Sequence, residues 1–284
     1  LRLRGAGTMP YDGIVLSGAV WEINGLLSGG RIEKVFQTGR YEITLLCHSR
    51  SDKYRLLISA DPEHPRLHLT KSKKENPMIA PPFAMVLRKH IAGGRILDIR
   101  QPGFERITEI DIESMNEMGD LGVKRIIAEF MGKYSNIILV DENGRILDSI
   151  KHVTHDRSSV REVLPGGLYE YPPSQNKLDP MELDFEGFEK IAEEKTGFDL
   201  QGLIYKSYTG ISPAYASEIC FNAGLDASDR AGQLDGGGIK RLYDSFKSDT
   251  EKIKRGEYTP HIVYDADGSV TDFFSLSSNQ YGGR

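Results

Sequence analysis

A carboxylate and a guanidinium follow one another at Glu105-Arg106, directly after the turn-like run Gln101-Pro102-Gly103-Phe104. The planar fork of Arg106 suits a phosphate or the edge of a guanine base, and Glu105 can orient that fork or accept from a base amino group. Taken alone, an adjacent Glu and Arg is more typical of a surface ion pair on a strand. Because adjacent strand residues face opposite sides, both reach one ligand only if the strand bulges or turns after Gly103.

These residues lie in the second copy of a repeated sequence. Gly29-Gly30-Arg31-Ile32 recurs 64 positions later as Gly93-Gly94-Arg95-Ile96, and Tyr41-Glu42 of the first copy aligns with Glu105-Arg106. If about six residues are inserted in the second copy, the alignment extends to residues 136–139. A duplicated unit implies a pseudo-symmetric domain, and a difference between the copies marks a place where symmetry was given up.

Each copy is predicted to fold as a helix followed by four strands. An imperfect helical stripe covers residues 13–27 and ends at a Gly-Gly pair, and a second helix begins behind Pro81-Pro82 and ends at the next Gly-Gly pair. Strand-like runs bounded by turn residues follow each helix. The sequence therefore predicts an α+β domain over residues 9–170, with pseudo-repeats at 13–75 and 80–150.

A Pro/Gly-rich connector marks the end of this domain. Residues 171–255 are predicted to form a helical domain, because apolar residues recur there at helical spacing. The run Gly236-Gly237-Gly238 predicts a flexible link. Residues 256–284 are predicted to form a short β-ribbon.

The helical domain contains a helix–hairpin–helix pattern. Helices are expected over residues 200–208 and 213–221, around the turn Thr209-Gly210-Ile211-Ser212, with Ser212 as the N-cap. In such a motif the backbone N–H groups of the turn can meet a phosphate, which makes Gly210 and Ser212 candidate phosphate contacts. An ordinary αα-corner is an equally good interpretation of this segment.

The overall charge does not indicate a nucleic-acid binder, since the 284 residues carry a net charge of -5. The local charge differs, because residues 86–106 hold five basic residues against two acids, while residues 181–200 hold seven acids against two lysines. Phosphate affinity is set by local cations, so this basic segment could bind a polyanion. A solvated helix face is the plainer alternative. The candidate phosphate contacts in the segment are Arg88, Lys89, Arg95 and Arg100.

The number of cysteines and the hydropathy of the chain exclude several classes of protein. Cys47 and Cys220 are the two cysteines, which excludes a disulfide framework and a zinc finger. No apolar run approaches the ~20 residues needed to cross a bilayer, and no signal peptide is visible. We therefore expect a cytoplasmic protein with no membrane contact. Residues 1–8 show no pattern, and we interpret Met9 as the native start and the leader as an expression remnant.

Two short runs bear on metal and phosphate binding. His152, His155 and Asp156 could ligate a metal from a helix, but a strand exit and loop are expected there, so no metal is predicted. The run Gly132-Lys133-Tyr134-Ser135 lacks the leading glycine of a phosphate-binding loop. No nucleophile motif stands out, and no cofactor is predicted.

Four segments together resemble the N-terminal half of NFACT proteins, whose bacterial members are called RqcH or fibronectin-binding protein A and whose animal member is NEMF. The resemblance covers nearly everything from Met9 onward. The family's long coiled coil and C-terminal RNA-binding domain have no counterpart here, so the chain is expected to be a fragment. The segments are Tyr11-Asp12-Gly13, Leu87-Arg88-Lys89-His90-Ile91, Gln101-Pro102-Gly103-Phe104-Glu105-Arg106-Ile107 and residues 129–139.

The resemblance implies a role in ribosome-associated quality control. Members of the family bind the large ribosomal subunit with its stalled peptidyl-tRNA and recruit charged tRNA, alanyl-tRNA in bacteria, for template-free C-terminal tailing of the nascent chain. An acidic-Arg pair needed for tRNA recruitment falls on Glu105-Arg106, where many members have Asp-Arg. Peptide transfer belongs to ribosomal RNA in this scheme, so the chain is expected to be a binding factor and not an enzyme.

Two other classes stay open. Formamidopyrimidine-type DNA glycosylases resemble the expected architecture of a two-layer N-terminal domain followed by helices, and Met9-Pro10 would supply an N-terminal proline amine for an abasic-site lyase. Against this, Tyr11 stands where the acid after that proline is expected, and two cysteines cannot form the zinc finger of many such enzymes. The other class is an adhesin that binds fibronectin, which the older family name suggests.

Overall fold

The computed structural model describes residues 11–115, 118–156 and 160–281, so Met9 and Pro10 lie outside the described residues. These residues form two compact units. The sheet unit comprises Ala19–Pro102 and Arg106–Pro173. The helical unit comprises residues 11–18, Gly103–Glu105 and residues 174–281. The chain passes between the units at four places, and one of them falls between Glu105 and Arg106.

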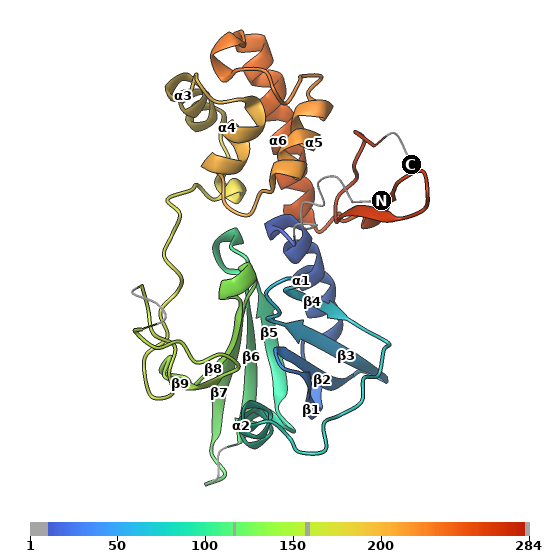
Figure 1. Ribbon diagram of the computed structural model, residues 1–284, viewed down its shortest axis with the longest axis vertical. Coiled ribbons are helices and arrows are strands. Elements are labelled where there is room, and N and C mark those ends of the chain that lie inside the picture. Colours follow the sequence, from blue (N-terminus) through green and yellow to red (C-terminus); the bar gives the residue numbers. More distant parts are fainter. Residues whose placement is uncertain (1–10, 116–117, 157–159, 282–284) are drawn as a thin grey trace. The chain divides into compact units, whose positions relative to one another are not determined.

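Nine antiparallel strands form one sheet in the described part of the sheet unit, in the order β4-β3-β2-β1-β5-β6-β7-β8-β9. The strands β1–β4 run across the direction of β5–β8, so the two halves of the sheet pack at an angle (Figure 1). The bounds are β1 Arg31–Gly39, β2 Glu42–Ser49, β3 Asp52–Ser59, β4 Arg66–Leu69, β5 Arg95–Arg100, β6 Ile107–Met115, β7 Leu121–Glu129, β8 Asn136–Val140 and β9 Ile146–Ser149.

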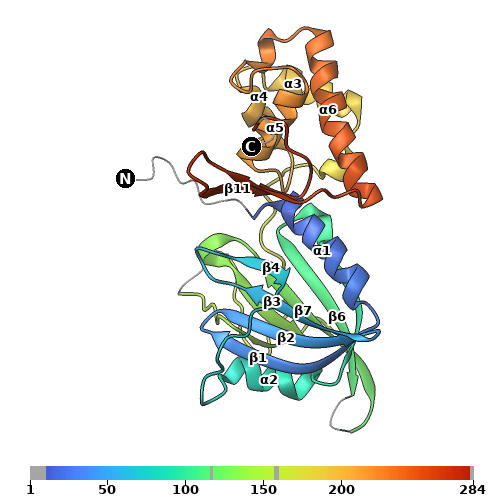
Figure 2. The same ribbon diagram turned by 90° about the vertical axis from the view of Figure 1, so that its right-hand side faces the viewer.

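Each half of the sheet begins with a helix, as predicted. These helices are α1 (Gly13–Leu27) and α2 (Pro82–Ile91), and α2 packs against β1, β6 and β9, as its place beside β1 in Figure 2 illustrates. The four-strand pattern was wrong for the second copy, which has β9 as a fifth strand. Asp141 makes this strand possible, because its carboxylate accepts from the amides of Asn143 and Arg145, each at 2.9 Å, and so closes the turn before β9.

The two halves meet at the repeated Gly-Gly pairs, with the symmetry that the duplication predicts. The amide of Gly29 donates to the carbonyl of Ile96 at 2.8 Å, and the amide of Gly93 donates to the carbonyl of Ile32 at 2.7 Å. Both glycines have φ +79°, a left-handed conformation that side chains disfavour. The conformation ends the preceding helix and turns the chain into β1 or β5, so one local structure serves both copies.

Besides the start of α1, four α-helices lie in the described part of the helical unit: α3 (Phe185–Glu194), α4 (Leu200–Ser207), α5 (Pro213–Asn222) and α6 (Gly236–Arg255). The predictions for α4 and α5 are confirmed, including Ser212 as N-cap, whose Oγ accepts from the amide of Tyr215 at 3.2 Å. The prediction of a flexible link at residues 236–238 was wrong. Asp235 caps a helix there, accepting from the amide of Gly238 at 2.7 Å, and this bond offsets part of the entropic cost of the three glycines.

The helical unit closes around a buried apolar cluster. Its members come from all four helices and from a C-terminal hairpin of β10 (His261–Tyr264) and β11 (Val270–Phe274), which confirms the predicted β-ribbon. Large fully buried members include Tyr208, Tyr215 and Phe246. An α+β domain followed by a helical domain is therefore the observed fold class. Among the described residues, no helix is both long and apolar enough to cross a membrane.

Candidate nucleic-acid interface

Glu105 and Arg106 lie where the chain turns from β5 into β6, after the short 3₁₀ helix Pro102–Phe104. Gly103 and Phe104 both have φ +55°, so the backbone here departs from an extended strand. This is the turn that the sequence required if both side chains were to serve one ligand. Both residues are half-buried.

Arg106 is fixed through its backbone and not through its side chain. The carbonyl of Arg106 accepts from the amide of Phe130 at 2.8 Å, which fixes its backbone at the start of β6. Among the described residues, the guanidinium of Arg106 forms no hydrogen bond or ion pair. Its charge is therefore available to an anionic ligand.

The strand register corrects the alignment of the two copies near this pair. In the first copy Phe36 lies opposite Thr44, and in the second Arg100 lies opposite Glu109, so β2 and β6 are offset by one residue more than β1 and β5. The turn before β6 absorbs the extra residue. The counterpart of Arg106 is consequently Tyr41, and both carbonyls accept from the following strand.

The turn of the helix–hairpin–helix motif packs against the segment that carries Glu105. The amide of Gly13 donates to the carbonyl of Gly210 at 2.7 Å. A Cβ atom on Gly210 would lie 2.5 Å from the carbonyl oxygen of Phe104, and one on Gly13 would lie 2.6 Å from the Cα of Gly210. Phe104 is itself buried in the apolar cluster of the helical unit. This three-way backbone contact holds Glu105 next to the turn.

A buried carboxylate supports the same contact. Asp12 is 7% exposed and caps α1, accepting from the amides of Ile14 at 3.1 Å and Val15 at 2.9 Å. Burial raises the pKa of Asp12, although hydrogen bonds from Ser212 and these amides lower it. Ser212 is 6% exposed, and its hydroxyl already serves Asp12 and the cap of α5. Gly210 and Ser212 thus have a packing role, and a phosphate contact by either stays a prediction.

Three of the four other basic candidates lie on the surface of the sheet unit. Arg88, in the last turn of α2, donates from Nε to the carbonyl of Val35 at 2.9 Å, so part of its role is structural. Lys89 is exposed on the same helix. Arg95 is exposed on β5, directly opposite Arg31 of β1, so two cations meet at the pseudo-twofold junction. Phosphate contacts by these residues stay predictions.

Arg100 belongs to an ionic network. Its guanidinium lies 2.5 Å from a carboxylate oxygen of Glu109, 2.6 Å from one of Asp111 and 3.2 Å from one of Asp98. Burial opposes a charged Arg100, but these acids raise its pKa overall. Asp111 is half-buried, and this partial desolvation raises its pKa, yet Arg125 and Arg100 hold that pKa below its usual value. Since its charge is already matched, Arg100 is a weaker phosphate contact than the sequence indicated.

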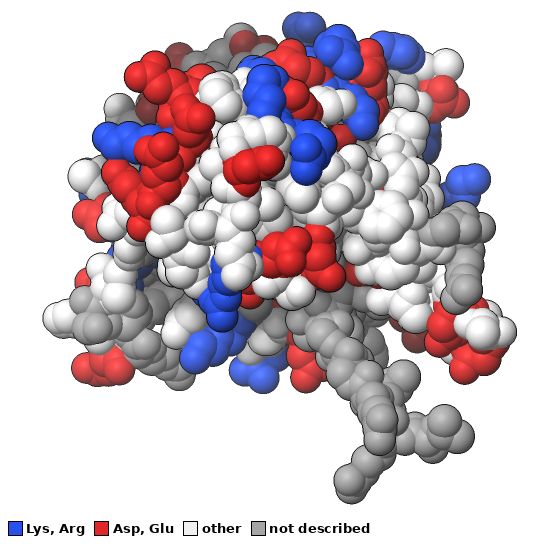
Figure 3. Space-filling view, turned by 90° about the horizontal axis from the view of Figure 1, so that it is seen from above, with Lys and Arg blue, Asp and Glu red and all other residues white. Residues whose placement is uncertain are grey.

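The face seen in Figure 3 carries both signs of charge. Acidic side chains gather at its left, on the side where Figure 1 has α3, and basic side chains lie between other acids elsewhere on it. The sequence of α3 supplies four glutamates, namely Glu186, Glu189, Glu193 and Glu194. This face therefore offers no continuous basic surface to a polyanion.

A hollow of about 730 Å³ in the sheet unit gathers residues that the sequence did not single out. Arg40 and Tyr41 line it from the β1–β2 turn, Lys133 and Tyr134 from the 3₁₀ helix Gly132–Tyr134, and Lys151 from the end of β9. Lys151 donates to the carbonyl of Ala60 at 2.6 Å and lies 4.4 Å from the ring of Tyr41. No single stretch of sequence signals this hollow, because its Lys and Arg residues come from four separate segments, Arg161 being the fourth.

His152 and His155 follow β9, where the sequence predicts a strand exit and loop. His152 Nε2 lies 2.7 Å from Asp148 Oδ1. Within the described residues, no three His, Cys, Asp or Glu side chains come together as metal ligands.

The model for NFACT N-terminal and middle domains matches residues 12–283. The chain belongs to the NFACT family. It is 38% identical over 218 residues to the Rqc2 homolog RqcH of Bacillus subtilis, a match that covers 76% of this chain and 38% of that protein. It is 28% identical over 264 residues to the archaeal Rqc2 homolog aRqcH of Methanocaldococcus jannaschii, which covers 90% of this chain and 37% of the relative.

Two solved structures share this fold. The N-terminal part of the fibronectin/fibrinogen-binding protein of Streptococcus suis has a TM-score of 0.79 and 31% identity, with 95% of this chain and 91% of that chain covered. The fibrinogen binding protein of Staphylococcus aureus has a TM-score of 0.77 and 32% identity, with 96% and 92% covered. The chain spans about two fifths of the length of the curated NFACT relatives above.

Proposed function

We propose that this chain is the tRNA- and ribosome-binding part of a ribosome-associated quality control factor. In this role it recruits alanyl-tRNA to a large ribosomal subunit that holds a stalled peptidyl-tRNA, so that the nascent chain is extended without a template. Peptide transfer is left to ribosomal RNA, and the chain supplies binding groups only. Membership of the NFACT family and similarity to proteins named Rqc2 homologs support the proposal.

The observation that carries the tRNA assignment is the setting of Glu105-Arg106. The turn takes the pair out of a regular strand, the Gly210 contact holds the Glu105 side, and the Arg106 guanidinium has no ion-pair partner among the described residues. A guanidinium in this state can meet a phosphate or a guanine edge with both of its outer nitrogens. Exposed nucleotides of an RNA loop are the usual targets of such recognition.

The proposal predicts that Glu105→Ala/Arg106→Ala separates tRNA binding from ribosome binding. The full-length protein and the variant would be isolated from cells and their bound RNA sequenced. The unchanged protein is expected to bring down large-subunit ribosomal RNA with enriched alanine tRNA. The variant should keep the ribosomal RNA and lose about tenfold or more of the tRNA, since two charge-assisted contacts are removed.

Two further variants sharpen this test. Glu33→Ala/Lys34→Ala removes an adjacent acid and base from β1 and should leave bound tRNA unchanged. Arg106→Lys keeps the charge but loses the planar fork, so a loss of tRNA in this variant would indicate recognition by two hydrogen bonds instead of simple charge attraction. If the unchanged protein brings down neither RNA, the proposed function is wrong.

A second candidate function is binding of fibronectin or fibrinogen. It is supported by the descriptions of the solved relatives from S. suis and S. aureus. Surface plasmon resonance with immobilised fibronectin tests it directly. Saturable binding that survives Glu105→Ala/Arg106→Ala would support a separate matrix-binding surface. If the unchanged protein does not bind fibronectin, this second candidate function is wrong.

A further inference from the structure

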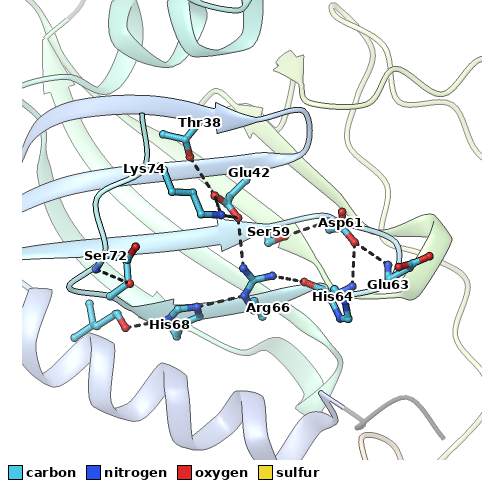
Figure 4. Close-up of polar contacts among 12 residues, drawn as sticks. Thr38, Glu42, Ser59, Asp61, Glu63, His64, Arg66, His68, Ser72 and Lys74 are labelled. Atoms are coloured by element: carbon cyan, nitrogen blue, oxygen red, sulfur yellow. Dashed lines mark hydrogen bonds and ion pairs between the residues drawn. The ribbon is translucent and has the colours of Figure 1, made fainter. Parts of the chain in front are cut away.

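A second hollow, of about 310 Å³, lies on the first copy of the repeat. We call it the basic pocket. Its lining includes the cations Arg55, Arg66, Lys73 and Lys74 and the hydroxyls of Thr44 and Ser72. The close-up in Figure 4 shows two of these side chains, Arg66 of β4 and Lys74 of the segment that follows it, converging on Glu42. Small anions fit a hollow of this size that is rich in donors.

One carboxylate partly neutralises the basic pocket. Glu42, which is 7% exposed, accepts from Lys74 Nζ at 2.7 Å and lies 3.4 Å from Arg66 Nη2 (Figure 4). Arg55 and Lys73 form no ion pair with another described residue. Four cations therefore face one acid, and the pocket keeps a local positive charge although the whole chain is negative.

The second copy shows what Arg55 lacks. Arg55 lies opposite Leu46 across β3 and β2, and its counterpart Arg125 lies opposite Asp111 across β7 and β6. Arg125 Nε donates to Asp111 Oδ1 at 2.5 Å. The first copy retains the arginine on the same backbone but has an apolar side chain in place of its carboxylate partner.

A second acid is missing from the first copy as well. Glu109 is 2% exposed, and its carboxylate lies 3.5 Å from Arg125 Nη1. The register places Thr44 at the equivalent position of the first copy, because Thr44 lies opposite Phe36 as Glu109 lies opposite Arg100. The two carboxylates that neutralise Arg125 in the second copy are thus absent around Arg55 in the first copy. An external anion can take their place.

Arg66 is held in position for such an anion. Its Nη1 donates to the carbonyl of His64 at 2.8 Å, and its Nε donates to His68 Nε2 at 3.3 Å. The other ring nitrogen, His68 Nδ1, lies 2.9 Å from the carbonyl of Leu69 and donates to it when Nε2 accepts. Less side-chain entropy is lost on binding when a guanidinium is already fixed in this way.

We propose that the basic pocket binds a backbone phosphate of RNA, as a contact additional to Glu105-Arg106. The inference rests on the proposed function, because it takes the RNA to be the tRNA that the chain recruits. Arg55 supplies the planar donor pair, Lys73 the exposed charge that draws the strand in, and Thr44 and Ser72 the hydroxyl donors. Lys73 is exposed, so the pocket opens to solvent at this residue. A phosphate within a continuous RNA strand can therefore reach it.

The test measures binding of fluorescein-labelled tRNA to the purified full-length protein by anisotropy over a range of salt concentrations. Arg55→Gln should weaken binding about tenfold and reduce the slope of log affinity against log salt by about one, the effect of losing one phosphate contact. Thr44→Glu imports the carboxylate of the second copy and should weaken binding at least as much. The control is Lys53→Gln, which removes a charge from the same strand at a residue paired with Glu33 outside the pocket.

The outcomes separate this inference from the proposed function. If the unchanged protein does not bind tRNA, both are wrong. If it binds tRNA and Glu105→Ala/Arg106→Ala abolishes binding, while Arg55→Gln and Thr44→Glu match the Lys53→Gln control in affinity and slope, the basic pocket is not an RNA site. If inorganic phosphate raises the melting temperature of the unchanged protein but not of Arg55→Gln, and tRNA affinity is unaffected, the pocket takes a free phosphoryl ligand and the inference is overturned. Circular dichroism melts confirm that each variant is folded.

Discussion

Gly210→Ala should destabilise the helical unit by about 2–5 kcal/mol. Gly210 has φ +73°, where a side chain costs about 1–2 kcal/mol by itself. The new Cβ would also stand 2.5 Å from the carbonyl oxygen of Phe104 and 3.1 Å from the Cα of Gly13, so backbone on two sides would have to move, at about 1–3 kcal/mol for overpacking. Urea unfolding followed by far-ultraviolet circular dichroism measures the change.

Gly224→Ala is the matched control for this prediction. Gly224 has φ +69°, but a Cβ there meets no atom within 4 Å, so only the conformational cost of about 1–2 kcal/mol applies. A Gly210→Ala variant no less stable than Gly224→Ala would mean that the contact with Phe104 is loose. In that case Glu105 would not be held beside the turn.

Arg161→Ala should destabilise the sheet unit by about 3–5 kcal/mol, since it leaves a buried charge without its partner. Glu129 is 0% exposed, and its carboxylate accepts from Arg161 and, at 2.9 Å, from the hydroxyl of Tyr169. Chemical unfolding monitored by Trp21, the single tryptophan of the chain and a residue of this unit, measures the loss. The double variant Glu129→Gln/Arg161→Met removes both charges and should recover most of the stability.

The same variant should show a pH dependence of known sign. Burial raises the pKa of Glu129, and Arg161 and Tyr169 lower it. Without Arg161 the pKa in the folded state rises further above its unfolded value, so the folded state binds a proton that the unfolded state has released. Stability of the variant then falls as pH rises through the folded pKa. The deficit relative to the unchanged protein should be larger at about pH 8 than at about pH 5, and an equal deficit at both would show that the loss of Arg161 does not raise the pKa of Glu129 in the folded state.

Local signals in the sequence were sufficient for most helices and for the duplication. The N-cap and first-turn pattern at Ser212-Pro213 located α5, and the Gly-Gly pairs located the ends of α1 and α2, because these features act within one helical turn. The same logic missed α6. Its N-cap, Asp235, stands before three glycines whose weak helix propensity hid it.

Contacts between residues on neighbouring strands could not be predicted from the sequence. The offset that makes Tyr41 the counterpart of Arg106 arises from one extra turn residue. The matching dipeptides Ile43-Thr44 and Ile107-Thr108 favour the alignment without that residue. The acids around Arg100 lie on β6 or beside it on β5, so their number is evident only once the register of β5 and β6 is known. The pairing of strands, and not their existence, is the information that a single sequence lacked.

The duplicated backbone has a consequence for how such a protein can acquire new surfaces. Each copy closes the same β-ladder with the same bulge, at Ile32/Lys34 in one and Ile96/Asp98 in the other. Because the same ladder occurs twice, the ionic cluster of one copy can be replaced by other side chains while the other copy keeps its cluster. The chain thus holds two versions of one strand set that differ in their side chains, and grafting side chains from copy to copy is a direct route to re-engineering its binding.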